Sequence, residues 1–592
     1  MRWSLDDYYV SFEDAGFLGD IKKVEEIITQ IEKRELPTVE SLDAAERAAI
    51  IEKVYKQNSE LSHLVSRLRG FCSLTLSVET DNTIALSHQQ KLQQKLIRLT
   101  KPSVRFRNWF ASKDDLDEVL GHSEYLKEIE FSLRDTLKMY RYLLSEKEED
   151  ILSRFSLTGS TAWNRMKGYL ESQHQIELEI DGKTQKYPLP AIRNFANDAS
   201  QEIRKKAYEA EIASYDAIAY PACSALNAIK GEVLQKAELK GYESVLDMTL
   251  VNSLMDKETL DTMLAVIKEY LPEFRKYLRR KGEMLGHKNG LPFYDLFAPI
   301  GKAEASLSFD EAREFVVGNF RKFSDKLADF ADNAFEKKWI DAEPRKGKRG
   351  GAFCSTCQAI KQSRVLANFN GSLGSVTTLA HELGHAYHGS CLKDELSQNT
   401  HYSMPVAETA SIFAETIVKD AITQSATGDA KLAILEAKLM ESTQVIVDIY
   451  SRFLFESRFI EARKEGDVSL EKTKELMLEA QKEAYGDGLD PEYLHPYMWL
   501  CKPHYYYAGS NFYNFPYAFG LLFALGLYAE YQKDKVGFVN KYDDILRETG
   551  RNDITGVAKF AGIDINQKAF WHGSLNIIKD EIAEFLSCSE NK

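Results

Sequence analysis

The sequence predicts a mainly α-helical protein, because hydrophobic residues recur at helical spacing over long stretches. Residues 263–277 carry such a pattern, with Pro272 as the expected kink of one helix. Charged helices are expected over residues 41–70 and 115–153. A further stretch has hydrophobic residues at steps of three, four and seven, which mark one buried helix face: Leu435, Leu439, Ile446, Ile449, Phe453 and Ile460.

Strand-like segments interrupt this helical pattern in two places. Residues 350–354 and 364–369, separated by a polar loop, predict two strands of a small sheet. One edge of that sheet could accept an extended chain as an added strand. Residues 177–182 are also strand-like, and a long helix is expected from about Asp198. We therefore predict an N-terminal helical domain over residues 1–200 and a second domain over residues 201–592.

The composition argues against several classes of protein. The 592 residues carry a net charge of −14, which would repel nucleic acid or an anionic membrane surface. The longest apolar run, residues 515–528, is too short to span a bilayer and predicts a core helix. Seven scattered cysteines do not form a disulfide framework, and the first residues lack a stretch of signal-peptide type. These features predict a cytoplasmic protein.

Residues 381–385 read His-Glu-Leu-Gly-His, which is the pattern of a helical zinc site. On a helix, His381 and His385 lie one turn apart on the same face, so that both imidazoles can bind one ion. Glu382 lies beside the first histidine and can act on the attacking water without being a ligand. The preceding residues 376–380 contain no Gly or Pro, so a helix starting near Gly374 can run into the motif.

A third zinc ligand must come from the residues downstream of the motif. Cys391 stands where a third histidine would be needed in one class of zinc hydrolase, which excludes that class. Residues 405–415 predict a helix on which Glu408 and Glu415 lie two turns apart on one stripe. Glu408 is therefore the predicted ligand, and Glu415 is predicted to orient a ligand histidine from behind. Glu395 is the alternative ligand, although its charged surroundings are typical of a solvated loop.

Cys354 and Cys357 form a C-x-x-C pair just upstream of the motif. No second pair follows at zinc-finger spacing, and no strand–helix pattern of redox type surrounds it. We expect a structural role for both, with a regulatory thiol near the site as the alternative.

Residues 493–517, the aromatic window, are rich in tyrosine and form a second candidate site. The window contains His495, His504 and seven tyrosines: Tyr493, Tyr497, Tyr505, Tyr506, Tyr507, Tyr513 and Tyr517. Phenol and imidazole donors fixed in a dry cleft can stabilise the oxyanion that a hydrolase generates. The alternative is amphipathic packing, with the rings in a core and the hydroxyls in water.

The motif and its surroundings resemble the oligoendopeptidase F family, within the thimet-oligopeptidase-like group of zinc peptidases. The likeness rests on residues 378–388 and 406–411 and covers roughly residues 200–585, with further matching segments at residues 347–354, 367–371, His504 and 512–520. It implies a two-lobed, almost all-helical fold with a small β-sheet near the active site and a deep substrate channel. Residues 201–592 would then be the zinc-peptidase catalytic domain.

The resemblance also implies roles for individual residues. It makes His381, His385 and Glu408 the ligands of one zinc ion and Glu382 the catalytic base. It supports His504 and Tyr517 most strongly as oxyanion donors, and Tyr507 and Tyr513 less so.

We therefore expect a zinc-dependent endopeptidase that cleaves internal bonds of short, unstructured oligopeptides. Two alternatives stay open. A metallo-carboxypeptidase would need a positive group for the substrate carboxylate, and no residue marks one. A non-catalytic peptide-binding scaffold is disfavoured because Glu382 stands intact beside both histidines.

Overall fold

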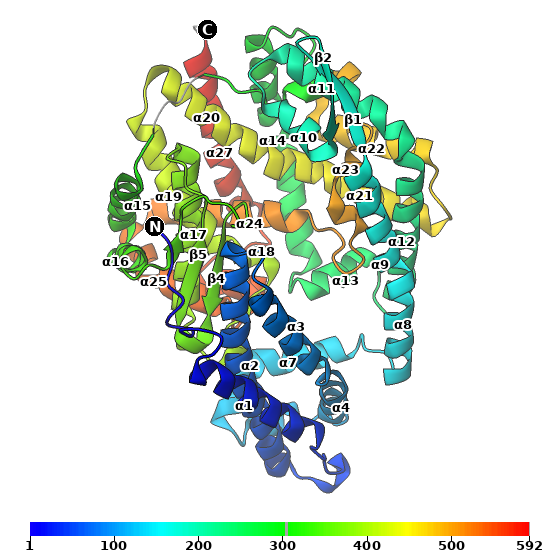
Figure 1. The fold of residues 1–592 in the computed structure, drawn as a ribbon, viewed down its shortest axis with the longest axis vertical. Coiled ribbons are helices and arrows are strands. Elements are labelled where there is room, and N and C mark those ends of the chain that lie inside the picture. Colours follow the sequence, from blue (N-terminus) through cyan, green and yellow to red (C-terminus); the bar gives the residue numbers. More distant parts are fainter. Residues whose placement is uncertain (302–305, 591–592) are drawn as a thin grey trace. The chain divides into compact units, whose positions relative to one another are not determined.

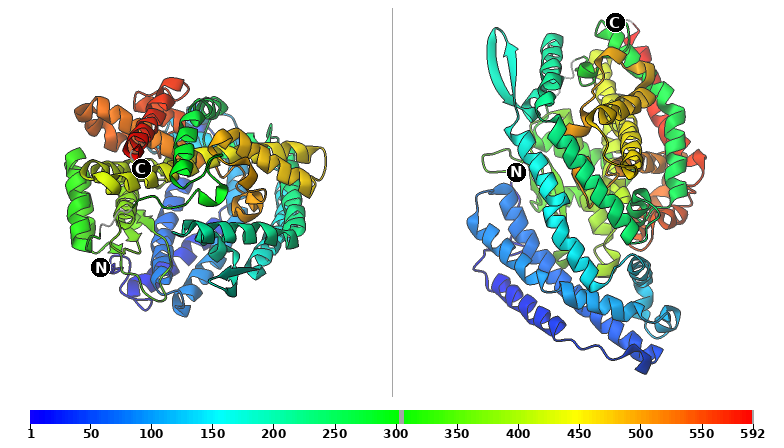
Figure 2. Two further views of the ribbon diagram at one scale, coloured as in Figure 1. Left: turned by 90° about the horizontal axis from the view of Figure 1, so that it is seen from above. Right: turned by 90° about the vertical axis from the view of Figure 1, so that its right-hand side faces the viewer.

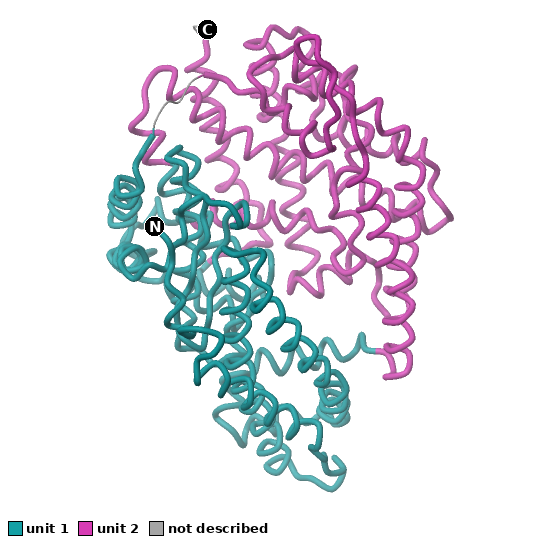
Figure 3. Tube along the Cα trace, in the orientation of Figure 1, with its two compact units in different colours: residues 1–143, 305–419, 530–562 teal, residues 144–304, 420–529, 563–592 magenta. Residues whose placement is uncertain are grey.

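The computed structural model describes residues 1–301 and 306–590 and divides them into two compact units (Figure 3). Unit 1 comprises residues 1–143, 305–419 and 530–562, and unit 2 comprises residues 144–304, 420–529 and 563–592. Each unit is thus assembled from three separate segments of the chain. Both are predominantly helical (Figure 1), which confirms the predicted fold class.

Unit 1 combines helices with the sheet that precedes the metal motif. Its strands are β3 (Ile340–Asp341), β4 (Phe353–Cys357) and β5 (Gln362–Leu366). Its helices are α1 (Ala15–Glu32), α2 (Ala44–Val78), α3 (Thr83–Ile97), α4 (Thr100–Ala111), α5 (Leu116–Leu120), α6 (Glu124–Glu128), α7 (Glu130–Tyr140), α15 (Phe309–Phe323), α16 (Asp325–Glu336), α17 (Leu373–Cys391), α18 (Met404–Ala407), most of α19 (Thr409–Ser425), α25 (Lys535–Glu548) and α26 (Ile554–Phe560).

The three strands of unit 1 lie in the order β3-β5-β4. β5 pairs in parallel with β3 and antiparallel with β4, with Cys354 opposite Val365. β4 is therefore an edge strand, and the motif helix α17 contacts both β4 and β5. Apolar residues of α17 such as Leu379 and Leu383 are fully buried, so that packing fixes the helix on which the motif lies.

Unit 2 is a helical assembly with one exposed β-hairpin. The hairpin consists of β1 (Gln175–Ile180) and β2 (Lys183–Pro188) and projects from the helices in Figure 2. The helices are α8 (Glu146–Thr158), α9 (Ser160–Gln173), α10 (Leu189–Asn194), α11 (Gln201–Ser214), α12 (Ala219–Leu239), α13 (Val245–Asn252), α14 (Lys257–Met284), α20 (Gly428–Thr443), α21 (Ile449–Lys464), α22 (Leu470–Tyr485), α23 (Met498–Cys501), most of α24 (Phe515–Lys533) and α27 (Lys568–Ser589).

Three predicted helical stretches can be compared with the observed elements. The stretch 435–460 is two helices, α20 and α21, joined through a π-helical turn at Gln444–Asp448. Residues 115–153 contain several helices, as predicted: the short helices α5, α6 and α7 and the start of α8. The apolar run 515–528 lies within α24, where Phe519 and Phe523 are fully buried, as a core helix requires.

Candidate metal centre

The motif histidines lie on α17, which begins at the N-cap Ser372. The Ser372 side chain accepts a hydrogen bond from the Ser375 amide, which satisfies a donor of the first helical turn. His381 and His385 follow on one face, with ring centroids 4.9 Å apart. Both side chains are partly exposed, so a ligand can reach them.

The motif glycine, Gly384, allows the next helix to pack closely against α17. A Cβ atom at this position would lie 2.6 Å from the Ala410 carbonyl oxygen and 2.7 Å from the Ser411 Cα of α19. Both atoms belong to backbone that cannot move aside cheaply. Gly384 therefore sets the separation between the histidine helix and the segment that carries Glu408.

Glu408 lies at the break between α18 and α19, directly opposite the histidines. Its Oε2 atom is 3.2 Å from Nε2 of His381 and 3.3 Å from Nε2 of His385. Ser411 donates a 2.8 Å hydrogen bond to the same oxygen. Burial would raise the pKa of Glu408, but the two imidazoles outweigh burial and hold that pKa well below its usual range. The potential ligand atoms of His381, His385 and Glu408 all lie within 4.8 Å of one another.

Glu415 approaches His381 from the other side of the ring. Its Oε2 is 3.0 Å from Nδ1 of His381, and its Oε1 forms an ion pair with Lys419 at 2.7 Å. Burial would lower the pKa of His381, but Glu408 and Glu415 outweigh it and raise this pKa to about 10. The Glu415 contact fixes Nδ1 and leaves Nε2 directed at Glu408, which is the arrangement of a ligand histidine.

Glu382 is buried beside the histidines without a fixed partner of its own. Only 6% of the residue is exposed, and its Oε2 has no hydrogen-bond partner among the described residues. Burial raises the pKa of Glu382, and the neighbouring His381 and His385 counteract this effect. An orphaned buried carboxylate oxygen beside a cluster of metal-type ligands marks a group held ready for a substrate or a water.

Glu395, the alternative ligand, is engaged elsewhere. Its carboxylate accepts a 2.7 Å hydrogen bond from Nε of Arg551, and its side chain is only 7% exposed. The expectation of a solvated loop at this residue is therefore wrong: its charge is buried and paired with arginine.

The C-x-x-C pair does not form a unit. Cys354 and Cys357 are three residues apart on β4, so their side chains point to opposite faces of the sheet. Cys357 belongs to an apolar cluster that contains Tyr8 and Phe71. Burial, together with the charge of Glu382, raises the pKa of Cys354 to about 12, so this thiol is uncharged at neutral pH.

Three of the predicted tyrosines gather around His504 in unit 2. The ring centroid of His504 lies 5.4 Å from that of Tyr513, 6.0 Å from that of Tyr507 and 6.4 Å from that of Tyr517. Nδ1 of His504 is buried and has no hydrogen-bond partner among the described residues. Burial, with the charges of Arg452 and Lys502, lowers the pKa of His504, so this imidazole is neutral at pH 7.

The other four tyrosines of the window are packing or surface groups. Tyr505 and Tyr506 are almost fully buried, and the hydroxyl of Tyr497 donates to Asp216 at 2.9 Å. The ring of Tyr493 packs on Tyr294. The hydroxyls of Tyr505 and Tyr506 are buried together with their rings, so these two residues pack in the core and do not place a hydroxyl in water.

A buried ion pair that the sequence did not reveal holds the loop before Tyr513. Glu456 and Lys230 lie 2.7 Å apart, and both are almost fully buried. Glu456 accepts hydrogen bonds from the Phe512 amide and from the Asn514 side chain, each at 3.0 Å. Phe512 has a φ of 51°, a left-handed conformation that is rare for a bulky residue and needs such support. The acid and the lysine are far apart in sequence and each lies within an ordinary helical pattern, so no local signal marks them.

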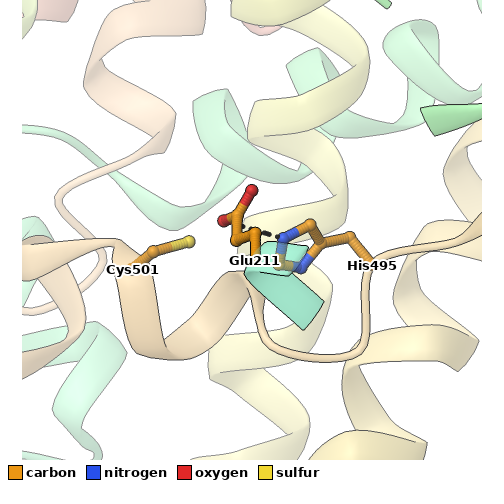
Figure 4. Close-up of side chains that lie close together, drawn as sticks. All are labelled: Glu211, His495 and Cys501. Atoms are coloured by element: carbon orange, nitrogen blue, oxygen red, sulfur yellow. Dashed lines mark hydrogen bonds and ion pairs between the residues drawn. The ribbon is translucent and has the colours of Figure 1, made fainter. Parts of the chain in front are cut away.

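Unit 2 contains a second group of potential metal ligands, Glu211, His495 and Cys501 (Figure 4). Glu211 lies between the other two and is 3.2 Å from Nε2 of His495. Arg193 donates to both Glu211 (2.9 Å) and the Cys501 sulfur (2.7 Å). Burial would raise the pKa of Glu211, but His495 and Arg193 outweigh it and lower this pKa to about 2. The guanidinium already supplies the positive charge that a metal ion would bring.

Comparison with known proteins identifies the family. The model of peptidase family M3 matches residues 194–577, and the Oligopeptidase F model matches residues 111–172. The chain belongs to peptidase family M3. It is 23% identical to Oligopeptidase PepF of Bacillus subtilis over 98% of this chain and 86% of that protein. It is also 26% identical to an oligoendopeptidase F homolog of Borreliella burgdorferi over 78% of each chain.

Solved structures share the fold of this chain over nearly their whole length. A structure from Chlamydophila abortus has a TM-score of 0.84 at 18% identity and covers 99% of this chain and 98% of its own. Oligoendopeptidase-F from Enterococcus faecium has a TM-score of 0.69 at 18% identity, over 98% and 99%. Family membership makes the chain a metalloendopeptidase of the oligopeptidase type. No helix among the described residues has the length and apolar character needed to cross a membrane.

Proposed function

We propose that this M3 peptidase uses one zinc ion held by His381, His385 and Glu408. The observation that carries the proposal is the convergence of two Nε2 atoms on a single Glu408 oxygen, at 3.2 and 3.3 Å. Two imidazoles and one carboxylate are the ligands of many catalytic zinc sites, which keep a further position open. One ion per chain is proposed because Arg193 occupies the second candidate cluster.

Glu382 is the proposed general base and acid. When bound, zinc supplies a Lewis acid that lowers the pKa of water toward about 7 and polarises a carbonyl group. Glu382 then accepts one proton from the attacking water while the water oxygen bonds to the scissile carbon. It returns that proton to the departing amine as the C–N bond breaks. Its buried, unpartnered Oε2 supports this role.

Other residues orient or complement the reacting groups. Glu415 holds Nδ1 of His381, so that Nε2 is the free ligand atom. His504 and Tyr517, with Tyr507 and Tyr513 beside them, are the proposed donors to the oxyanion. Their mutual clustering supports this assignment, although they belong to a different unit from the ligands.

The proposed substrates are short, unstructured oligopeptides that enter a deep channel and are cut internally. The family and the names of the similar proteins support this class of substrate. We also propose the cytoplasm as the compartment, because all seven cysteines are free thiols, and no nucleic-acid or membrane partner, because of the net charge of −14.

A quenched fluorescent peptide with both ends blocked tests the function. The purified protein should cleave it internally with zinc present, and a chelator should abolish cleavage until zinc is restored. Cleavage confined to peptides with a free carboxyl terminus would favour a metallo-carboxypeptidase. Binding without turnover would favour a scaffold.

A further inference from the structure

A polar cavity in unit 1 lies close to the proposed zinc site, and none of the roles assigned above uses it. It measures about 430 Å³ and is bounded by α2, by β4 and by the end of α17. Gly389 of α17 lines it, and a rise of 1.5 Å per residue places that residue about 6 Å along the helix from His385. Tyr402, which also lines the cavity, stacks on His388 with ring centroids 4.2 Å apart.

The lining carries the positive charge of Arg69 and no negative charge, although the whole chain carries a net charge of −14. It contains Arg69, His63, His401 and many serine and threonine hydroxyls, and no acidic side chain among the described residues that form it. The Ser397 hydroxyl lies 2.9 Å from Nε2 of His63, which keeps that ring in place.

Arg69 carries a charge that the fold itself does not use. It is exposed, and no described residue forms an ion pair or a hydrogen bond with it. Its neighbour on α2 provides a contrast, since Arg67 lies 3.4 Å from Asp20 and stacks over Tyr9. A guanidinium with an open fork of N–H donors suits a carboxylate, which it binds through two parallel hydrogen bonds.

We propose that this cavity receives a carboxylate of the substrate peptide and that Arg69 determines this specificity; the inference rests on the proposed peptidase function. Among the described strands, β4 pairs only with β5, and its residues Ser355 and Thr356 line the cavity. A peptide added along that open edge would place one of its residues in the cavity. An extended chain advances about 3.3 Å per residue, so that residue lies about two or three positions from the scissile bond.

Matched peptides test the inference. In end-blocked quenched peptides, glutamate replaces glutamine at each of three positions on either side of the scissile bond. A second pair compares a free carboxyl terminus with its amide, which distinguishes a side-chain carboxylate from a terminal one. The parent should prefer one carboxylate-bearing peptide by about tenfold in kcat/KM, mainly through KM.

Variants assign that preference to Arg69. Arg69→Ala should abolish it, and Arg69→Glu should favour a lysine-containing peptide instead. Lys53→Ala removes an exposed positive charge from the same helix outside the cavity and should keep the parental preference.

Each outcome has a distinct meaning. If the parent cleaves every peptide with equal kcat/KM, the inference is overturned and the proposed function still stands. The same holds if the preference survives Arg69→Ala. A zinc-loaded parent that cleaves none of the peptides refutes the proposed function, and the inference fails with it.

Discussion

One oxygen of Glu408 contacts both motif histidines. Substitution of Glu408 therefore tests most directly which carboxylate binds the zinc ion. Glu408→Ala should weaken zinc binding by more than about a hundredfold, because even the loss of a partner behind a ligand costs tenfold to a hundredfold. Zinc content after dialysis against a buffered metal solution measures the effect. Glu395→Ala is the matched control, since Glu395 contacts Arg551 and not the histidines. If Glu395→Ala loses zinc while Glu408→Ala retains it fully, Glu395 and not Glu408 is the third ligand.

The oxyanion donors form a second test at this scale. Tyr517→Phe removes one hydroxyl and keeps the ring, so kcat should fall by about a hundredfold to a thousandfold. KM should stay within a fewfold, because the lost interaction belongs to the transition state. Tyr497→Phe, whose hydroxyl donates to Asp216, should leave kcat close to parental. A parental kcat in Tyr517→Phe would make that tyrosine a packing residue and move attention to Tyr513 and Tyr507.

At the residue scale, the sequence predicts which side chains can meet where the signal is local. The i, i+4 histidines and the two-turn spacing of Glu408 and Glu415 follow from helix geometry alone, and both carboxylates do reach His381. The burial of Glu395 against Arg551 could not be predicted, because the two residues are 156 positions apart.

At the scale of elements, the contact between α17 and α19 depends on Gly384. Gly384→Ala places a methyl group against the α19 backbone, and overpacking of this kind costs about 1–3 kcal/mol in the free energy of unfolding. Zinc affinity should fall as well, because Glu408 immediately precedes α19. Chemical denaturation and metal titration measure the two effects.

Gly374→Ala is the control on the same helix. A Cβ there would meet only Ser372 Oγ at 3.9 Å, so this variant should retain zinc and gain about 0.5–1 kcal/mol of stability. Parental zinc affinity and stability in Gly384→Ala would show that the close approach of the two helices is not required.

Elements with strong periodicity were predicted well, and those without it were not. β2 has no alternation to detect, because nearly all of its residues are exposed. The sequence predicts helices over residues 115–153, but it does not locate the turns, such as Gly121–His122, that divide this stretch into short helices.

At the scale of the whole molecule, the proposed channel limits which substrates reach the zinc. Unstructured peptides should be cut internally, whereas native globular proteins should survive, because only an extended chain fits between helical walls. Incubation of a native globular protein and, separately, of a short unstructured peptide taken from its sequence, followed by mass spectrometry, measures this. Efficient digestion of the native form would contradict an enclosed site.

Which segments of the chain combine into each unit could not be predicted from the sequence. Unit 1 brings residues 1–143 together with residues 305–419 and 530–562. Local periodicity carries no information about such long-range pairing. The predicted boundary near residue 200 falls inside the first segment of unit 2.

The central claim is that Glu382 acts as the base at a zinc ion that it does not ligate, and Glu382→Gln tests it most directly. The change keeps the size of the side chain and removes its ability to accept a proton. The variant should retain about one zinc per chain, while kcat falls by about a hundredfold to ten-thousandfold. Loss of zinc from this variant, or turnover close to that of the parent, would contradict the account.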